Sequence, residues 1–253
     1  MRKASAPSGR EEKASPQAFL AKVLPSLSTE AIAELARISL QIRYEQDELI
    51  AQEGSYASGI YIVRNGLVSI GKYSSRGWDR RRLRFLAVGE MFGLEAIFLE
   101  RDPINVQFAK AIVESTLVFF ERSNILAFSR ENPWIFRDLC RWLAREVIFL
   151  EFKLTREAVE SNDRNLALLL LALGNKYGIR DGEVVRVDLP ISRQTMAEML
   201  GVSVETLLRG LRRFRELGFV ADEPGRISIQ DPAKLAERAR VTDFYLSIVE
   251  ETL

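Results

Sequence analysis

Residues 190–217 have the sequence PISRQTMAEMLGVSVETLLRGLRRFREL, which predicts two short helices joined by a tight turn. Ser192 is a good N-cap, because its hydroxyl can accept a hydrogen bond from an unpaired N–H of the first helical turn. The first helix is therefore expected over Arg193–Leu200. Gly201 can take the left-handed backbone that ends such a helix, and Ser203 would cap a second, longer one. Two helices around a glycine-containing turn are typical of a helix-turn-helix motif.

The second helix of this motif is expected to have two different faces. Apolar residues recur at i, i+4 and i+7, which predicts a buried stripe. They are Leu207, Leu211 and Phe214. On the opposite side lie Glu205, Arg209 and Arg212. Arginine can donate two hydrogen bonds to guanine, and a carboxylate can accept one from cytosine, so this face suits the major groove of DNA. The alternative is a solvated helix in which Glu205 and Arg209 form an ordinary ion pair.

The overall charge is nearly balanced, with 36 Lys and Arg residues against 35 Asp and Glu residues. Binding to nucleic acid would therefore depend on a local basic cluster. Such a cluster is formed by Arg209, Arg212, Arg213 and Arg215. The longest apolar run, Leu166 to Leu173, is far shorter than the ~20 residues of a membrane-spanning helix. No charged-then-apolar leader opens the chain, so we expect neither a signal peptide nor a membrane partner.

Cysteine and histidine usage limits the chemistry. Cys140 is the only cysteine, which excludes internal disulfides and predicts a reducing, cytoplasmic location. A lone cysteine on a packed helix is more often inert than a redox switch. The absence of histidine removes the usual general base, histidine-ligated haem and most zinc sites. Since the sequence also lacks a metal cluster and a phosphate-cradling glycine loop, we expect no enzyme, no metal and no cofactor.

The N-terminal half alternates short apolar segments with glycine. Residues 1–16 lack periodicity and predict a disordered tail, after which Ser28 begins a helix. From 42 to 120 the segments alternate with period two, and Asn65-Gly66 is a strong hairpin signal. Strands this short predict a small antiparallel barrel or roll, which we assign to residues 17–132.

Residues 133–161 predict a long helix. Its apolar residues follow one another at steps of three and four, which is a heptad pattern for two helices packed side by side. They are Phe136, Leu139, Leu143, Val147, Leu150 and Leu154. No comparable helix exists elsewhere in the sequence, so we interpret this segment as the dimerisation helix of a homodimer.

The remaining residues predict a winged helix-turn-helix over 162–231. A strongly apolar helix, Arg164–Tyr177, and an alternating strand, 184–189, precede the motif. After it, two short alternating segments flank Pro224-Gly225, a pair that fits a type II turn. A further helix is expected within 232–253, and its role cannot be assigned. The whole chain is therefore expected to be α+β, with an N-terminal antiparallel β-roll, a long helix and a C-terminal winged helix-turn-helix.

This order of parts resembles the cyclic AMP receptor protein/FNR family of bacterial transcription regulators over residues 20 to 230. Gly54, the segment IYIV (60–63) and Gly66 look like the first glycine turns of that family's cyclic-nucleotide-binding-like roll. GEMFG (89–93) looks like its ligand-side loop. ISRQ (191–194) and SVET (203–206), with Arg209, are similar to its DNA reader. The resemblance implies a homodimer, a near-palindromic double-stranded DNA site and RNA polymerase as a further partner.

The resemblance also assigns roles within the DNA reader. Base-reading positions are matched by Val204, Glu205, Leu208 and Arg209. Phosphate-contacting positions are matched by Ser192, Arg193, Gln194, Ser203, Thr206 and Arg226, to which we add Arg212 from the same face. Val204 replaces an arginine of the cyclic AMP receptor protein and is similar to the FNR branch, whereas Leu208 replaces a serine of that branch.

The effector site departs further from the family. The Arg-Ser pair that holds the cyclic phosphate is matched by Asn105 and Val106, and the base-reading Thr-Ser pair of the long helix by Leu150 and Glu151. Loss of a charge-assisted contact and a repulsive carboxylate make cyclic AMP an unsuitable ligand. An iron–sulfur cluster needs more cysteines than Cys140 alone. We therefore expect a pocket of Gly93 with these four residues to take a different small molecule, or none.

Two functions remain open at this point. The first is a homodimeric, sequence-specific DNA-binding regulator. The second is a sensor or scaffold module whose winged helix contacts protein instead of DNA, because a fold does not fix a function.

Overall fold

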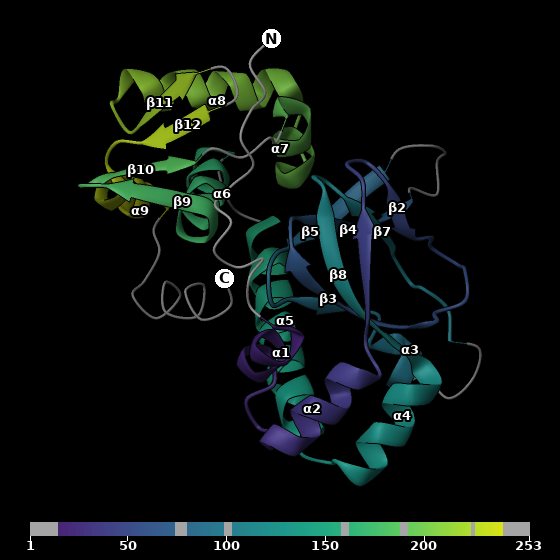
Figure 1. The fold of residues 1–253 in the computed structure, drawn as a ribbon. Helices are drawn as coiled ribbons and strands as arrows, with labels where there is room; N and C mark the ends of the chain where they lie inside the picture. Colours follow the sequence, from purple (N-terminus) through teal and green to yellow (C-terminus); the bar gives the residue numbers. More distant parts are fainter. Residues whose placement is uncertain are drawn as a thin grey trace. The chain divides into compact units, whose positions relative to one another are not determined.

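A computed structural model describes the protein as two compact units, with the division between Leu143 and Ala144 (Figure 1). The structure describes residues 15–73, 80–98, 103–157, 162–187, 192–223 and 226–239 of the 253. None of the helices in these ranges combines the length and the apolarity that crossing a bilayer requires.

The first unit is built around the predicted roll. Its strands are β1 (Leu40–Tyr44), β2 (Leu49–Ala51), β3 (Gly59–Asn65), β4 (Val68–Tyr73), β5 (Arg80–Leu86), β6 (Met91–Phe92), β7 (Phe108–Ala111) and β8 (Ser115–Glu121). The described residues form two four-stranded antiparallel sheets in this unit, in the orders β1-β8-β3-β6 and β2-β7-β4-β5. The α+β class and the antiparallel roll are thus confirmed.

Local sequence explains how the two sheets are joined. The prediction of a hairpin at Asn65-Gly66 is wrong, because β3 and β4 belong to different sheets and do not pair. Asn65-Gly66 instead forms the turn that carries the chain from one sheet to the other, and Gly66 has a φ of 94°, a conformation that residues with a side chain rarely adopt. A Cβ at Gly66 would also lie 2.2 Å from Ser115 Oγ. Val63, Val68 and Leu117, which flank this corner, are almost fully buried between the sheets.

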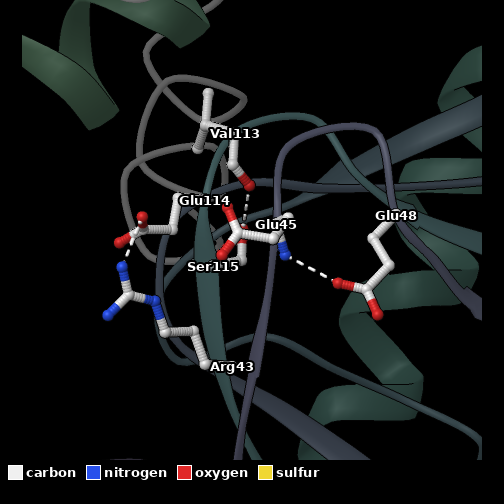
Figure 2. A network of polar contacts seen from close by, with 6 residues as sticks. All are labelled: Arg43, Glu45, Glu48, Val113, Glu114 and Ser115. Carbon is white, nitrogen blue, oxygen red and sulfur yellow. Dashed lines mark hydrogen bonds and ion pairs between the residues drawn. The ribbon is translucent and has the colours of Figure 1, made fainter.

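A polar network holds one end of the roll (Figure 2). It comprises Arg43, Glu45, Glu48, Val113, Glu114 and Ser115. Arg43 at the end of β1 forms an exposed ion pair of 2.6 Å with Glu114, which precedes β8. Ser115 Oγ donates to the carbonyl of Val113 at 2.7 Å. Since exposed ion pairs contribute about 1 kcal/mol or less, the network fixes the loops more than it stabilises the fold.

Helices complete the first unit. They are α1 (Pro16–Val23), α2 (Thr29–Arg37), α3 (Glu95–Phe98) and α4 (Arg122–Glu131). Ser28 caps α2 as predicted, accepting from the N–H of Ala31 at 3.2 Å. The sequence did not predict α1: Ser15 and Pro16, assigned to the tail, are its N-cap and first residue. The rest of the predicted tail, 1–14, lies outside the described residues.

The long helix α5 (Ile135–Glu157) begins within the core of the first unit. Leu139 is only 3% exposed, and Phe136 packs against the same core. Asp138 is buried and accepts hydrogen bonds from the backbone N–H and the hydroxyl of Ser26, both at 2.8 Å. Phe136 and Leu139, which were predicted to belong to a dimer seam, thus contribute to the core of their own chain.

The second unit contains the remaining elements. They are α6 (Asn162–Tyr177), β9 (Gly178–Asp181), β10 (Val184–Val187), α7 (Arg193–Leu200), α8 (Val204–Glu216), β11 (Val220–Glu223), β12 (Arg226–Ile229) and α9 (Pro232–Ala239). Its strands form one antiparallel sheet in the order β11-β12-β10-β9. The helix-turn-helix and the wing are confirmed, although the predicted turn at Pro224-Gly225 lies outside the described residues. Strand β9 was not predicted.

Helix α9 packs into the core of this unit. Leu235 and Ala239 are fully buried, in the same cluster as Leu166 and Phe214. Arg164 Nε also donates to the carbonyl of Ala239 at 2.7 Å. The beginning of the C-terminal segment, whose role was unassigned, therefore belongs to the hydrophobic core of the helix-turn-helix unit. The rest of that segment, 240–253, lies outside the described residues.

Candidate nucleic-acid interface

The two motif helices begin at the caps that the sequence predicts. Ser192 Oγ accepts from the N–H of Thr195 at 3.0 Å, and Ser203 Oγ accepts from the N–H of Thr206 at 3.2 Å. Gly201 ends α7 in the left-handed region, with φ of 67° and ψ of 29°. The turn between the helices is thus set by local hydrogen bonds and one glycine.

The orientation of α8 is fixed by its buried face. Leu207, Leu211 and Phe214 are each 1% exposed or less, as predicted. Burial of each such side chain contributes roughly 1.5–3 kcal/mol. Gly210 lies on the same face, where a Cβ would be 2.8 Å from Leu166 Cδ2 on α6, so glycine allows the two helices to approach closely. Figure 1 shows α8 beside α7 and the wing strands.

The opposite face of α8 carries the predicted DNA-reading side chains. Glu205, Arg209 and Arg212 are exposed, and Leu208 retains 45% of its accessible surface. Arg209 Nη2 donates to Thr206 Oγ1 at 3.2 Å. Among the residues that the structure describes, no ion pair joins Glu205 to Arg209. The simple intrahelical salt bridge that was the alternative interpretation of this spacing is therefore absent from that part of the chain.

The basic cluster of α8 divides into two groups. Arg213 Nη1 lies 2.5 Å from Asp163 Oδ2, and Arg238 Nη2 of α9 lies 2.9 Å from the same oxygen. The Asp163 side chain is only 9% exposed. Arg213, although its side chain is 54% exposed, therefore attaches α8 to Asp163 of α6, which Arg238 of α9 also contacts. Arg209, Arg212 and Arg215 are the other exposed cations of the helix. This difference among the arginines of α8 could not be predicted from the sequence, because Asp163 is distant from Arg213 along the chain.

The predicted phosphate-contacting residues gather at the helix starts and on the wing. Ser192, Gln194 and Ser203 are exposed at the N-termini of α7 and α8, where N–H groups favour anions. Gln194 Nε2 donates to Glu198 at 3.0 Å. Arg193 is partly buried, and its Nη1 lies 3.3 Å from the sulfur of Met196. Arg226 is exposed at the first position of β12.

Val204 differs from the other predicted base-reading residues. It is partly buried and packs against the core of the second unit. Only part of its side chain is thus available on the surface, whereas Leu208 is much more accessible.

Asn105 and Gly93, two residues of the candidate effector site, make close contacts within the roll itself. Asn105 is 8% exposed, and its amide donates to Ser55 Oγ at 3.0 Å and to the carbonyl of Tyr56 at 3.2 Å. Both N–H bonds of that amide are therefore used within the loop. Gly93 has a φ of 87°, and a Cβ there would lie 2.3 Å from the carbonyl oxygen of Gly59. Val106 is 38% exposed.

Two further positions of the candidate pocket lie on α5. Leu150 is 43% exposed, and the side chains of Glu151 and Leu154 lie outside the described residues. The sequence analysis missed Glu95 on α3. Burial raises the pKa of its carboxyl, while hydrogen bonds from the N–H groups of Glu95 and Val106 act in the opposite direction. In the described part of the chain, no cluster of three or more acidic or cysteine side chains could hold a metal ion.

Two family models match the chain. The cyclic nucleotide-binding domain matches residues 41–132, and the Crp-like helix-turn-helix domain matches residues 165–238. The first match covers the roll, and the second begins in α6 and ends in α9. A roll and a helix-turn-helix of these kinds define a DNA-binding transcription regulator.

Known proteins resemble the chain over most of its length. It is 27% identical to the CRP-like cAMP-activated global transcriptional regulator of Mycobacterium tuberculosis, covering 87% of this chain and 97% of that protein. It is 25% identical to the nitrogen fixation regulation protein FixK of Bradyrhizobium diazoefficiens, covering 84% of this chain and 87% of that protein. The structure of FixK2 from Bradyrhizobium japonicum shares the fold, with a TM-score of 0.70 at 23% identity over 81% of this chain and 99% of that one. The chain belongs to the Crp/Fnr family of transcription regulators.

Proposed function

We propose that the protein is a homodimeric regulator that reads a near-palindromic DNA site through α8. The observation that carries the proposal is the outward face of this helix, where Glu205 and Arg209 are exposed and not paired with each other. Arg209 suits guanine O6 and N7, and Glu205 suits cytosine N4. Leu208 and the accessible part of Val204 flank these two polar groups.

Contacts to DNA phosphates would fix the register of α8. We propose hydroxyl and amide contacts from Ser192, Gln194, Ser203 and Thr206, and ionic contacts from three arginines. These are Arg193, Arg212 and Arg226. Such contacts position the protein without reading sequence. Because each phosphate contact releases counterions, affinity is expected to fall steeply with salt concentration.

The dimer is supported by an exposed apolar stripe on α5. Leu143 is 36% exposed, Val147 52% and Leu150 43%, and they succeed one another at steps of four and three. A regular stripe of this kind is typical of a helix that packs along a second copy of itself. The proposed seam begins at Leu143, since Phe136 and Leu139 are used in the core. Two copies of α8 about 34 Å apart would enter successive major grooves.

Four proposed domains follow from these elements. They are the roll (17–132), the dimerisation helix (133–161), the winged helix-turn-helix (162–231) and the C-terminal helix (232–253). The burial of Leu235 and Ala239 supports an extension of the DNA-binding domain to residue 239. We propose that the protein acts in the cytoplasm and contacts RNA polymerase, as a transcription regulator of this family.

Cyclic AMP is not the proposed effector. Asn105 stands at the phosphate-holding position, and its amide hydrogens are already used by Ser55 and Tyr56. We propose either a different small molecule or no effector. Any effector must bind one arrangement of the dimer better than another, because a ligand shifts an equilibrium only by its differential affinity.

Selection of DNA from a randomised duplex library by the purified full chain tests the proposal. We expect one near-palindromic sequence to be enriched. Arg209→Ala should weaken binding to that sequence by roughly 5- to 150-fold for each half-site relative to random DNA, because one bidentate base contact contributes about 1–3 kcal/mol and the dimer makes it twice. Arg215→Ala removes an equal charge from the same helix and is the matched control. Equal binding of all duplexes by the native chain would instead favour a scaffold module whose winged helix contacts protein.

A further inference from the structure

Leu208 is an apolar side chain on an otherwise polar surface. The other leucines and the phenylalanine within α8 are almost fully buried, whereas Leu208 is 45% exposed. Its neighbours on the outward face are Glu205, three residues before it, and Arg209 and Arg212, one and four residues after it. Leu208 therefore stabilises no core of its own unit, and its surface is available to a partner.

We infer that Leu208 recognises the 5-methyl group of a thymine in the major groove. This inference rests on the proposed function. Thymine is the one DNA base that presents a methyl group there, and apolar side chains contact it. Residues three and four apart share a helix face, so Leu208 lies beside the group formed by Glu205 and Arg209. The thymine is therefore expected within one base step of the G·C pair that these two residues read.

An apolar protein partner fits this surface less well. A protein-binding patch normally extends over several hundred Å² of contiguous apolar surface. The next exposed leucine of the motif, Leu217 (53% exposed), ends the helix about 13 Å further along its axis. Charged residues separate the two leucines, so Leu208 is an isolated apolar contact point. An apolar surface as small as one leucine side chain is suited to contact with a single methyl group.

The expected size of the effect follows from the area of one methyl group. Removal of a buried CH₂ or methyl contact changes affinity by about fourfold. In a near-palindromic site both half-sites contribute, so substitution in both should weaken binding about 15-fold.

The test uses the full chain and the duplex that it selects from a randomised library. Each thymine of the selected site is replaced by deoxyuridine, which removes the methyl group and keeps base pairing unchanged. For the native chain we expect about fourfold weaker binding at one thymine position of each half-site. Leu208→Ala should bind the thymine and deoxyuridine duplexes equally, whereas Leu217→Ala, the matched control, should keep the native difference.

The possible results distinguish failure of methyl recognition by Leu208 from failure of the proposed regulator function. If the native chain selects a sequence but no deoxyuridine substitution changes its affinity by more than about twofold, Leu208 does not read a methyl group, although the regulator function stands. The inference also fails if Leu208→Ala remains sensitive to deoxyuridine. Failure of the native chain to select any sequence overturns both. Leu208 is exposed, so its alanine variant is expected to fold, which the melting temperature checks.

Discussion

Replacement of Asp163 by alanine should loosen α8 from its own domain. The Asp163 carboxylate is the shared acceptor of Arg213 on α8 and Arg238 on α9, at 2.5 and 2.9 Å. The carboxylate is 9% exposed, but the two arginine side chains are 54% and 47% exposed, so both would regain water in the variant. Each charge-assisted hydrogen bond contributes about 1.5–3 kcal/mol when well buried. With solvent screening of the arginines we expect a total loss of about 2 kcal/mol.

Urea unfolding of the full chain, followed through its helical circular dichroism, measures this loss. The variants Asp163→Ala and Arg213→Ala and the double variant form a cycle, and we expect a coupling energy of at least ~0.5 kcal/mol between the two residues. Arg215→Ala is the control, because Arg215 is exposed on the same helix and should change stability by less than about 0.5 kcal/mol. Strictly additive effects of Asp163 and Arg213, or a loss no larger than that of the control, would refute the anchoring role of Asp163.

Two further predictions concern α3 and α5. Burial raises the pKa of Glu95 above its ordinary value of 4.5, so its stabilising contribution is complete below pH 4.5 and is lost as pH rises through the folded-state pKa. The side chain of Glu95→Gln stays neutral at every pH, so we expect this variant to have a higher melting temperature than the native chain at pH 7. Near pH 4 the difference in melting temperature should be smaller. Equal melting temperatures of the two proteins at both pH values would contradict this prediction. Val147→Glu places a charge on the exposed apolar stripe of α5, so we expect the proposed dimer to dissociate into monomers in analytical ultracentrifugation. Arg137→Glu, on an exposed position outside the proposed seam, should remain dimeric, and a dimeric Val147→Glu variant would contradict the seam.

Features that depend on neighbouring residues could be predicted from the sequence. Ser28, Ser192 and Ser203 act as caps within their own first helical turn, and a cap is visible in the sequence three residues before its partner. Gly201 ends α7 for an equally local reason, its left-handed backbone. The buried stripe of α8 follows from helical periodicity alone, so Leu207 was identified correctly.

Features that depend on distant residues could not be predicted. Leu139 fits the heptad spacing of α5 as well as Leu143 does, and only the packing of the start of the helix into the core cluster of the first unit determines that Leu139 is buried. Arg212 and Arg213 are adjacent and chemically identical. Their different environments depend on Asp163, fifty residues from Arg213. Periodicity identifies a helix face, but it does not reveal which distant element covers that face.

Asn105, which the resemblance to the family matches to the phosphate-holding position, is held by hydrogen bonds within the roll itself. Its backbone N–H donates to the carbonyl of Ser55 at 2.8 Å, and its carbonyl accepts from the N–H of Gly54 at 2.8 Å. Its amide adds two further contacts to the same turn. A buried polar group stabilises its surroundings only when its hydrogen bonds are made, and here the protein itself supplies the partners that a bound phosphate would otherwise supply. The proposed DNA-reading face of α8 is built from other residues, in the other unit.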